Sequence, residues 1–448
     1  MRTAVRNVLI SVLQAESKLV LLKYKPKIIA ITGSVGKTST KDAVYAMLSK
    51  VSYVRKSEKS YNSELGLPLT ILGVPNGWND PKIWLKDIVR GLWLIVAPHK
   101  YPEWLILEVG VGKPGDMKRT ASWLKTDAVV ITAIGETPAH IEFFDSRKHL
   151  VEEKSGLIKT LKRDGILVLN RDDETVLEMG NKTKNRIVTY GFNATGNTKP
   201  DIIGSSDAIS YDTEGKPQGV IFRVDVEGKS LPVVIEGVFG KNHVFAAMAT
   251  IALSFGLKFN ILDAINALKN YDVPPGRMRL LKGINDTLII DDTYNSSPYA
   301  CESALNTLGE VKCSGPARNA EGIASAGGRK IAVLGDMLEL GKHTVEAHQN
   351  IGRIVKEKAD ILIIAGPRAE AIKAGALEAG MKPENIFEFL DAYQAGDFIK
   401  TYVKSGDVIL VKGSQGMRME RVVGAILFDQ ANKANLIVRQ DKEWLAKK

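Results

Sequence analysis

Cysteine and histidine are scarce in this sequence, and their scarcity excludes two kinds of protein. Cys301 and Cys313 are the only cysteines among 448 residues, so a disulfide framework is excluded and a reducing, cytoplasmic compartment is expected. The six histidines are scattered, and neither cysteine stands at a metal-binding spacing. The sequence therefore carries no zinc-site pattern.

Long hydrophobic runs are also missing. No stretch reaches the roughly 18 uninterrupted apolar residues that a membrane-spanning helix needs. The N-terminal stretch has a basic start, but Gln14, Glu16 and Lys18 interrupt its apolar residues, and no small-residue cleavage site follows. It predicts a short amphipathic helix and not a signal peptide. We expect a soluble protein that at most associates with a surface.

The charge balance is basic but not concentrated. Lysine and arginine number 61 against 51 acidic residues, which gives a net charge of +10 without any basic run. Such a surplus suits nucleic acid, anionic lipid or a polyanionic substrate such as a nucleotide. Because no segment resembles a nucleic-acid-binding module, we expect no nucleic-acid partner. The basic surplus alone does not distinguish anionic lipid from a polyanionic substrate such as a nucleotide.

The composition and patterning predict two α/β domains. Hydrophobic residues make up 44% of the chain, which is the level of a globular protein, and 448 residues exceed one ordinary core. Apolar strands alternate with amphipathic helices from about residue 27, and alternating strands joined by turns take over between about 201 and 240. The turn Pro274-Pro275-Gly276 is typical of a domain boundary. We expect a helical lead segment over 1–26 and domains over 27–273 and 274–448.

The segment ITGSVGKTST, residues 31–40, predicts a phosphate-binding loop. Its strand, glycine turn and helix start let backbone amides point inward at phosphate oxygens, and the helix N-terminus adds partial positive charge. Lys37 would reach the β- and γ-phosphates of ATP, and the Thr38 hydroxyl would ligate Mg²⁺. A glycine-rich turn with a chance lysine is the alternative. The residues expected to bind ATP here are Gly33, Ser34, Val35, Gly36, Lys37, Thr38 and Ser39.

This short loop and the motifs that follow it resemble the Mur ligase family. The resemblance covers about residues 28–425, nearly the whole chain. Its motifs occur in the family's order: YNSELGLPLTIL at 61–72, EVGVGKPGDM at 108–117, ITAIGETPAHIEFF at 131–144, GVFGKNHVFAAMA at 237–249, PPGRMR at 274–279, DDTYNSSP at 291–298, VLGDMLELG at 333–341 and VKGSQGMRMER at 411–421.

The resemblance implies both a fold and a reaction. The implied fold is α/β, with a central P-loop ATPase domain built on a mostly parallel sheet and a C-terminal Rossmann-like α/β domain. In the implied reaction, ATP phosphorylates a carboxylate and an amine then attacks the acyl phosphate, with ATP and Mg²⁺ required. The last motifs look most like the branch that joins D-alanyl-D-alanine to a UDP-linked muramoyl peptide in peptidoglycan synthesis, and hence in cell-wall biogenesis.

The same resemblance implies the metal ligands. Glu108 is expected on the first Mg²⁺ with Thr38, and His140 on a second metal. Lys154 falls where the family carries a carbamylated lysine, which would bridge the metals as a carboxylate. Together with Lys37, His140 and Lys154 form the expected catalytic set. The alternative is that these residues have no role at the site: Glu108 would be solvated, His140 a surface histidine and Lys154 a solvent-facing lysine. The sequence also departs from the family near Lys154, because Gly156 replaces a glutamate that is common in the family.

The remaining implied residues come from later motifs. His243 stands where the family has the asparagine that meets adenine, and Arg277 and Asp292 should reach phosphate and ribose from the second domain. A second-substrate cleft is expected from four residues whose polar or basic groups would hold the acceptor: Asn295, Lys412, Ser414 and Arg418.

Two departures from the family pattern bear on substrate and partners. The phosphate loop begins at residue 33, which leaves no room for the N-terminal domain with which the family grips the UDP group. We expect that a partner supplies this grip, that the substrate differs, or that binding relies on the other domains. A Mur-like ligase of the folate-polyglutamate or cyanophycin type therefore stays open, as does a nucleotide-binding partner protein without ligase turnover.

The second departure is a long, tryptophan-rich stretch between Leu72 and Glu108. Asp80 and Pro81 predict a helix start, and the helix should stop before Pro98. Apolar residues nearly surround this helix while Lys82, Lys86 and Arg90 dot one side. Residues 80–97 are therefore expected either to lie against anionic lipid or to pack on the core or a second subunit.

Overall fold

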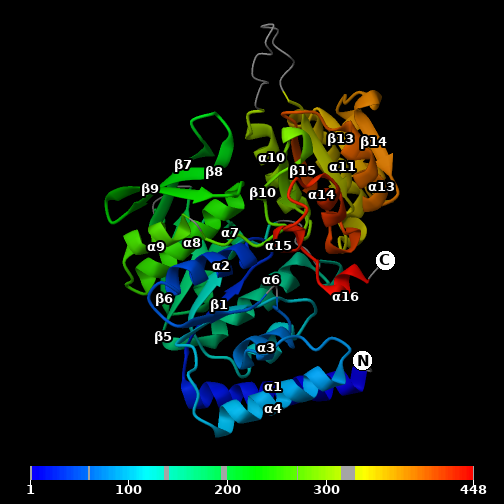
Figure 1. Ribbon diagram of the computed structural model, residues 1–448. Helices are drawn as coiled ribbons and strands as arrows, with labels where there is room; N and C mark the ends of the chain where they lie inside the picture. Colours follow the sequence, from blue (N-terminus) through cyan, green and yellow to red (C-terminus); the bar gives the residue numbers. More distant parts are fainter. Residues whose placement is uncertain are drawn as a thin grey trace.

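The computed structural model describes residues 3–58, 61–135, 141–192, 199–269, 271–313 and 328–446. Two sheets organise these residues, and each is flanked by helices (Figure 1). The predicted boundary between residues 273 and 274 falls between the two sheets. An isolated bridge between Val238 and Arg279 joins the backbones on either side of it.

The first sheet has nine strands in the order β2-β3-β1-β4-β5-β6-β7-β8-β9. Pairing is parallel from β2 to β7 and antiparallel from β7 to β9, so the predicted antiparallel segment after residue 200 extends a parallel sheet. The strands are β1 (Lys27–Thr32), β2 (Val54–Lys56), β3 (Trp104–Glu108), β4 (Thr126–Ile131), β5 (Leu161–Asn170), β6 (Arg186–Gly191), β7 (Ile202–Tyr211), β8 (Pro217–Val226) and β9 (Lys229–Glu236).

Helices cover both faces of this sheet. They are α1 (Thr3–Tyr24), α2 (Lys37–Leu48), α3 (Gly66–Leu72), α4 (Pro81–Val96), α5 (Asp116–Ala121), α6 (Arg147–Ser155), α7 (Glu174–Glu178), α8 (Lys241–Gly256) and α9 (Ile261–Leu268). Alternate residues of β1 enter different cores: Ile29 and Ile31 pack with α2 and α8, whereas Ile28 and Ala30 pack with α1 and α3. A strand buried on both faces explains the unbroken apolar run KIIAIT.

The second sheet has six strands in the order β10-β11-β15-β12-β13-β14, with only β10 antiparallel to its neighbour. Its strands are β10 (Arg279–Lys282), β11 (Leu288–Asp292), β12 (Lys330–Gly335), β13 (Ile361–Ala365), β14 (Ile386–Phe389) and β15 (Val408–Lys412). Its helices are α10 (Pro298–Glu310), α11 (Thr344–Lys358), α12 (Glu370–Glu378), α13 (Ala392–Tyr402), α14 (Glu420–Ile426), α15 (Lys433–Leu436) and α16 (Lys442–Leu445). The predicted Rossmann-like α/β arrangement is confirmed.

The helix expected after Asp80 is also confirmed. The Asp80 side chain accepts a hydrogen bond from the backbone N–H of Lys82 at 2.8 Å, and Pro81 is the first helical residue of α4. Helices α1 and α4 lie side by side below the first sheet, beyond α3 (Figure 1). Glu16 of α1 is buried against Gly91 of α4, where an added Cβ would come within 2.2 Å of the Glu16 carboxylate.

Glu16 gives a pH-dependent prediction. Burial raises the pKa of its carboxyl from 4.5 to about 7, and α3, which also packs on α1, carries no titratable side chain. A raised folded pKa means that the folded state keeps the proton after the unfolded chain has released it. The contribution of Glu16 to the free energy of unfolding is therefore fully present below about pH 4.5, and it is lost as the pH rises towards 7. The neighbouring acid on α4, Asp87, shifts in the same direction, to about 6, with Arg90 and Lys86 opposing the shift.

Glu16→Gln removes this ionisation, so it should stabilise the protein by about 2 kcal/mol at pH 8 and by little at pH 4.5. Denaturant unfolding at the two pH values measures the difference. An equal effect of the substitution at both pH values would show that Glu16 is not buried as described.

Candidate active site

The phosphate loop is anchored at the carboxyl end of β1. Gly33 has φ +145°, and a Cβ there would lie 2.0 Å from the Thr132 hydroxyl, so only glycine fits. Thr132 donates to the carbonyl of Val35 at 2.6 Å, and the amide of Ser34 donates to the carbonyl of Ala133 at 2.6 Å. The loop is thus fixed on the end of β4, and α2 begins directly behind it. The first-turn amides of α2 have no acceptor within the helix and point at the loop.

Glu108 ends β3 directly beside this loop. Its carboxylate is 1% exposed and accepts from the Thr38 hydroxyl at 2.9 Å and from the Asn62 amide at 3.0 Å. Arg277, which belongs to the segment before β10, donates to the same Thr38 hydroxyl at 3.0 Å. The two residues expected to hold the first metal therefore lie in contact, and a residue from beside the second sheet reaches them.

Lys154 reaches the loop from α6. Its ammonium donates to the carbonyl of Gly33 at 3.1 Å, and the side chain is 2% exposed, which rules out a solvent-facing lysine. Burial, with the charge of Lys37 adding to it, lowers the pKa of Lys154 to about 7. The amine is therefore partly neutral at physiological pH. Gly156, the departure from the family pattern, ends α6 and lies against Met117.

Cationic groups surround the buried Glu108 carboxylate. Lys37 donates to the carbonyl of Ser34 at 3.3 Å, and burial lowers its pKa while Glu108 opposes the shift. Lys41, one helical turn further along α2, is buried with its ammonium 3.9 Å from Glu108. The sequence reasoning missed Lys41, although its four-residue spacing from Lys37 places both on one helix face. A site with this charge suits a polyanion.

Two polar atoms beside the loop are buried without a partner. Within the described part of the chain, neither the Ser34 hydroxyl nor the Nε of Arg277 makes a hydrogen bond. Buried groups of this kind are costly unless satisfied, so both are available to a ligand that carries oxygens. Phosphate oxygens fit these donors.

His243 is buried, and it is one of the residues that line the small cavity beside the loop. One ring nitrogen contacts the Tyr271 hydroxyl and Nε2 contacts the carbonyl of Arg277 at 2.7 Å. Burial lowers its pKa to about 4, so the ring is neutral and holds both contacts. The ring therefore positions the backbone of Arg277, and its expected contact with adenine stays a prediction.

The second sheet contributes a buried ion pair. Asp292, at the end of β11, accepts from Lys412, at the end of β15, at 2.5 Å. Lys412 also donates to the carbonyl of Asn295 at 3.0 Å. A cavity of about 70 Å³ is lined by both members of the pair, by Asn295 and by Ser34 of the loop. The expected nucleotide residues Arg277 and Asp292 are thus brought to the loop, as is Asn295.

Ser414 and Arg418 are buried in local contacts. The Ser414 hydroxyl accepts from the amide of Leu338 at 2.8 Å. Arg418 donates to Glu420 at 2.6 Å and to the carbonyl of Trp444 at 3.1 Å, and it is 7% exposed. The guanidinium of Arg418 thus braces the C-terminal helices, and its expected contact with the acceptor stays a prediction. His140 lies outside the described residues.

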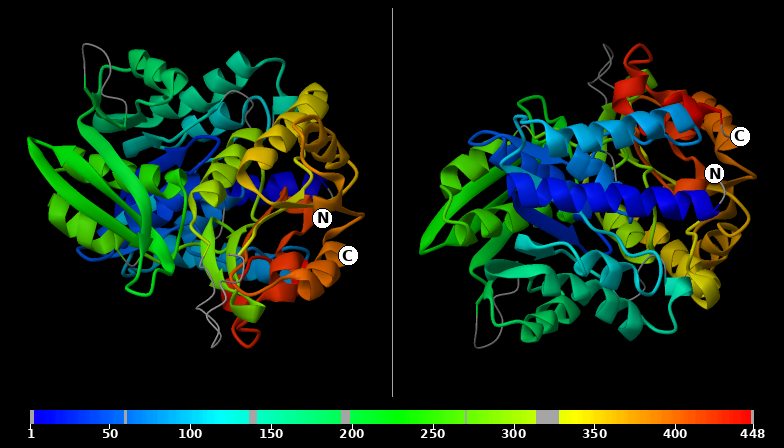
Figure 2. Two further views of the ribbon diagram at one scale, coloured as in Figure 1. Left: turned by 90° about the horizontal axis from the view of Figure 1, so that it is seen from above. Right: turned by 90° about the horizontal axis from the view of Figure 1, so that it is seen from below.

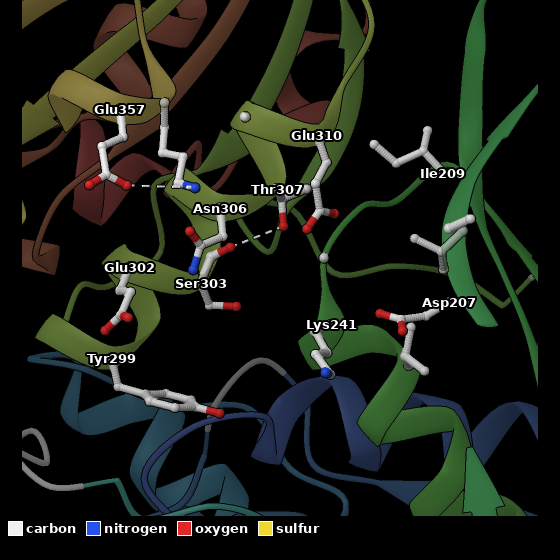
Figure 3. A pocket seen from close by; sticks show the side chains of 16 residues that line it. Asp207, Ile209, Lys241, Tyr299, Glu302, Ser303, Asn306, Thr307, Glu310 and Glu357 are labelled. Atoms are coloured by element: carbon white, nitrogen blue, oxygen red, sulfur yellow. Dashed lines mark hydrogen bonds and ion pairs between the residues drawn. The ribbon is translucent and has the colours of Figure 1, made fainter. Parts of the chain in front are cut away.

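A larger cavity lies next to the small one. It has a volume of about 650 Å³ and opens between β7, the start of α8 and α10. Figure 3 shows Lys241 and Tyr299 at one side of it, with Asn306 and Glu310 on α10 opposite. Gly240 and Lys241 line this cavity while the next residue, Asn242, lines the small one. The two cavities are therefore lined by consecutive residues at the start of α8.

No protein metal cage is present among the described residues, since no group of three His, Cys, Asp or Glu side chains comes together there. The donor set beside the loop is one carboxylate and one hydroxyl. Mg²⁺ suits such a set because it keeps several waters and takes phosphate oxygens as ligands.

Comparison with known proteins agrees with this fold and site. Residues 31–254 match the Mur ligase middle domain, and residues 276–415 match the Mur ligase glutamate ligase domain. The chain belongs to the Mur ligase family, so the family predicted from the motifs is confirmed.

Individual relatives show which members of the family the chain is similar to. The chain is similar to UDP-N-acetylmuramoyl-tripeptide–D-alanyl-D-alanine ligase of Bacillus subtilis, at 29% identity over 417 residues, covering 92% of this chain and 79% of that protein. Among solved structures, MurF ligase from Thermotoga maritima in complex with ADP has a TM-score of 0.72 at 26% identity, covering 92% of this chain and 82% of that one. Folylpolyglutamate synthase from Thermotoga maritima shares the fold, with a TM-score of 0.55 at 17% identity over 93% of this chain and 94% of that one.

The buried contacts of Arg418 give a prediction about stability. Arg418→Gln leaves the Glu420 carboxylate, which also accepts from Arg439 at 2.9 Å, with only one cation. Breaking a buried ion pair costs about 3–5 kcal/mol, so the unfolding free energy should fall by that order. Arg353→Gln is the matched control, because its pair with Glu378 is exposed and should cost about 0–1 kcal/mol. Equal, small losses for both variants would show that the Arg418 guanidinium does not brace these helices.

Proposed function

We propose that this chain is an ATP-dependent ligase that adds D-alanyl-D-alanine to a UDP-N-acetylmuramoyl peptide through an acyl phosphate. The observation that carries this proposal is the contact of the Thr38 hydroxyl with Glu108 at 2.9 Å, directly behind a glycine loop and within reach of Arg277. This is a site for a nucleotide with a divalent ion. The likeness to D-alanyl-D-alanine ligases along 92% of the chain supports the substrate pair.

In the proposed reaction, a carboxylate oxygen of the UDP-linked peptide attacks the γ-phosphorus of ATP, and the bond to ADP breaks. The amine of the dipeptide then attacks the acyl carbon, phosphate leaves with the bond electrons, and the amine gives up a proton as the amide forms. Negative charge is spread over the phosphoryl oxygens throughout the first step. The protein's task is to hold and neutralise these oxygens.

The residues divide this task. Lys37, the amides at the start of α2 and the Ser34 hydroxyl would hold phosphate oxygens, and the buried Nε of Arg277 would donate from beside the second sheet. Thr38 and Glu108 would hold Mg²⁺, which supplies charge neutralisation at the phosphates when bound. Asp292 and Lys412, buried as a pair beside Asn295, would form the wall of the cleft on the side of the second domain.

Lys154 would serve the site as a carbamate. Carbamylation requires a neutral amine, and the buried position of Lys154 against the Gly33 carbonyl keeps its amine partly neutral. The neutral amine forms an N–C bond with carbon dioxide and releases one proton, so an ammonium that has first lost a proton is replaced by an anion. An anion at this point suits the cations and metals beside it better than an ammonium does.

The direct test is an assay of phosphate release with ATP, Mg²⁺ and a panel of UDP-muramoyl peptides, with and without D-alanyl-D-alanine. Release should require both donor and dipeptide, because the acyl phosphate turns over only when the amine attacks it. Donors from folate-type ligases serve as the comparison. Binding of ATP without release for any pair would favour a nucleotide-binding protein without ligase turnover.

Lys154→Ala should lower turnover by about a hundredfold or more, because a charge-stabilising group at the phosphates is lost. Added bicarbonate should not restore it, since alanine cannot form a carbamate. Lys159→Ala, an exposed lysine five residues further on, is the matched control and should be unaffected. Full activity of Lys154→Ala would show that no carbamate on Lys154 is needed for turnover.

A further inference from the structure

Helices α1 and α4 form an outer layer of the molecule. Seen from below in Figure 2, they run side by side across the face of the protein that lies away from the second sheet. Lys23, at the end of α1, donates to the carbonyls of Leu94, Ile95 and Ala97 at the end of α4, at 2.9, 2.9 and 2.6 Å. Because their C-termini meet, the two helices are parallel and present one common outward surface.

The outward side of α4 is apolar along its length. Leu85, Val89, Leu92, Trp93 and Val96 are each more than half exposed. Their spacing of three to four residues places them on one helix face. The opposite side of the helix is buried at Trp84, Asp87 and Gly91 and faces the protein.

The outward side of α1 repeats this pattern. Val8, Leu19 and Leu22 are between 49% and 69% exposed. Leu19 follows Val8 by eleven positions and Leu22 follows Leu19 by three, and both spacings place the side chains on the same face of a helix. Two apolar stripes, one from each helix, thus lie next to each other on one surface.

On this helix pair the basic side chains are exposed and the acidic side chains are buried. Its basic side chains, in the residues whose side chains the structure describes, are all exposed: Arg6, Lys18, Lys23, Lys82, Lys86 and Arg90. The only two acidic residues, Glu16 and Asp87, are both buried between or beneath the helices. The outward surface therefore combines apolar stripes with positive charge and presents no carboxylate in the described parts of α1 and α4.

We propose that the outward surface of α1 and α4 docks the protein on a membrane that contains anionic lipid. Apolar side chains flanked by cations are the composition of a helix that lies in the lipid interface, and anionic headgroups complement the exposed Lys82, Lys86 and Arg90 of α4 and Lys18 of α1. A second copy of this chain fits less well, because a two-fold interface would bring basic surfaces together. The contact would be peripheral: of the helices described, none is long and apolar enough to span a bilayer.

The test is sedimentation of the full chain with vesicles of phosphatidylcholine alone or with about 30% phosphatidylglycerol. We expect at least about tenfold more partitioning onto the anionic vesicles, and a decrease at high salt because charge attraction is screened. Lys82→Glu with Lys86→Glu and Arg90→Glu should lower the anionic partitioning at least about tenfold. Leu92→Gln with Trp93→Gln should lower it as well, because the apolar contact is lost.

The matched controls make the same kinds of substitution at exposed positions outside α1 and α4. Lys356→Glu with Lys400→Glu and Lys404→Glu repeats the charge change, and Leu390→Gln with Leu445→Gln repeats the apolar change. Both controls should partition like the unaltered chain. All variants should keep ATP-dependent phosphate release in solution, which shows that they are folded.

Two outcomes would overturn the proposal. One is equal partitioning of the helix variants and the controls onto anionic vesicles. The other is a dimer in lipid-free sedimentation velocity that only the α1 and α4 variants abolish, since a second copy would then cover this surface.

Discussion

The buried carboxylate of Glu108 is the group on which the arrangement of the site depends. An ionised carboxylate out of water requires hydrogen bonds and opposite charge. Glu108 receives hydrogen bonds from Thr38 and Asn62, and Lys41 lies 3.9 Å away. Arg277 adds a contact to Thr38 from the other side of the cleft. The carboxylate thus draws together the phosphate loop, the segment after β2 and the segment that enters the second sheet.

Parallel strands make this gathering possible. The carboxyl ends of neighbouring parallel strands meet at one edge of a sheet, and β3, β1 and β4 are neighbours in the first sheet. The end of β3 supplies Glu108, the end of β1 leads into Gly33, and the end of β4 supplies Thr132, which fixes the loop. Residues from three distant segments therefore meet without a long connection between them.

Features that rest on local pattern were predictable from sequence, and features that rest on distant pairing were not. The strand KIIAIT, the loop at Gly33 and the cap at Asp80 follow from periodicity and residue type within a few positions. The contact of Arg277 with Thr38 spans 239 residues, so only the family likeness pointed to it. Buried neighbours engage the ring of His243 and the guanidinium of Arg418, and residue type alone does not reveal such contacts. Periodicity marked the exposed face of α4 without indicating that α1 lies parallel to it.

Glu108 and Thr38 are expected to hold Mg²⁺ for a nucleotide bound at the loop. Calorimetric titration of ADP into the unaltered chain and into Glu108→Gln, with Mg²⁺ or with a chelator, measures this directly. Mg²⁺ should tighten ADP binding about tenfold or more in the unaltered chain, and Glu108→Gln should lose this gain while ADP still binds weakly. Full Mg²⁺ dependence in Glu108→Gln would show that the Glu108 carboxylate does not hold the metal.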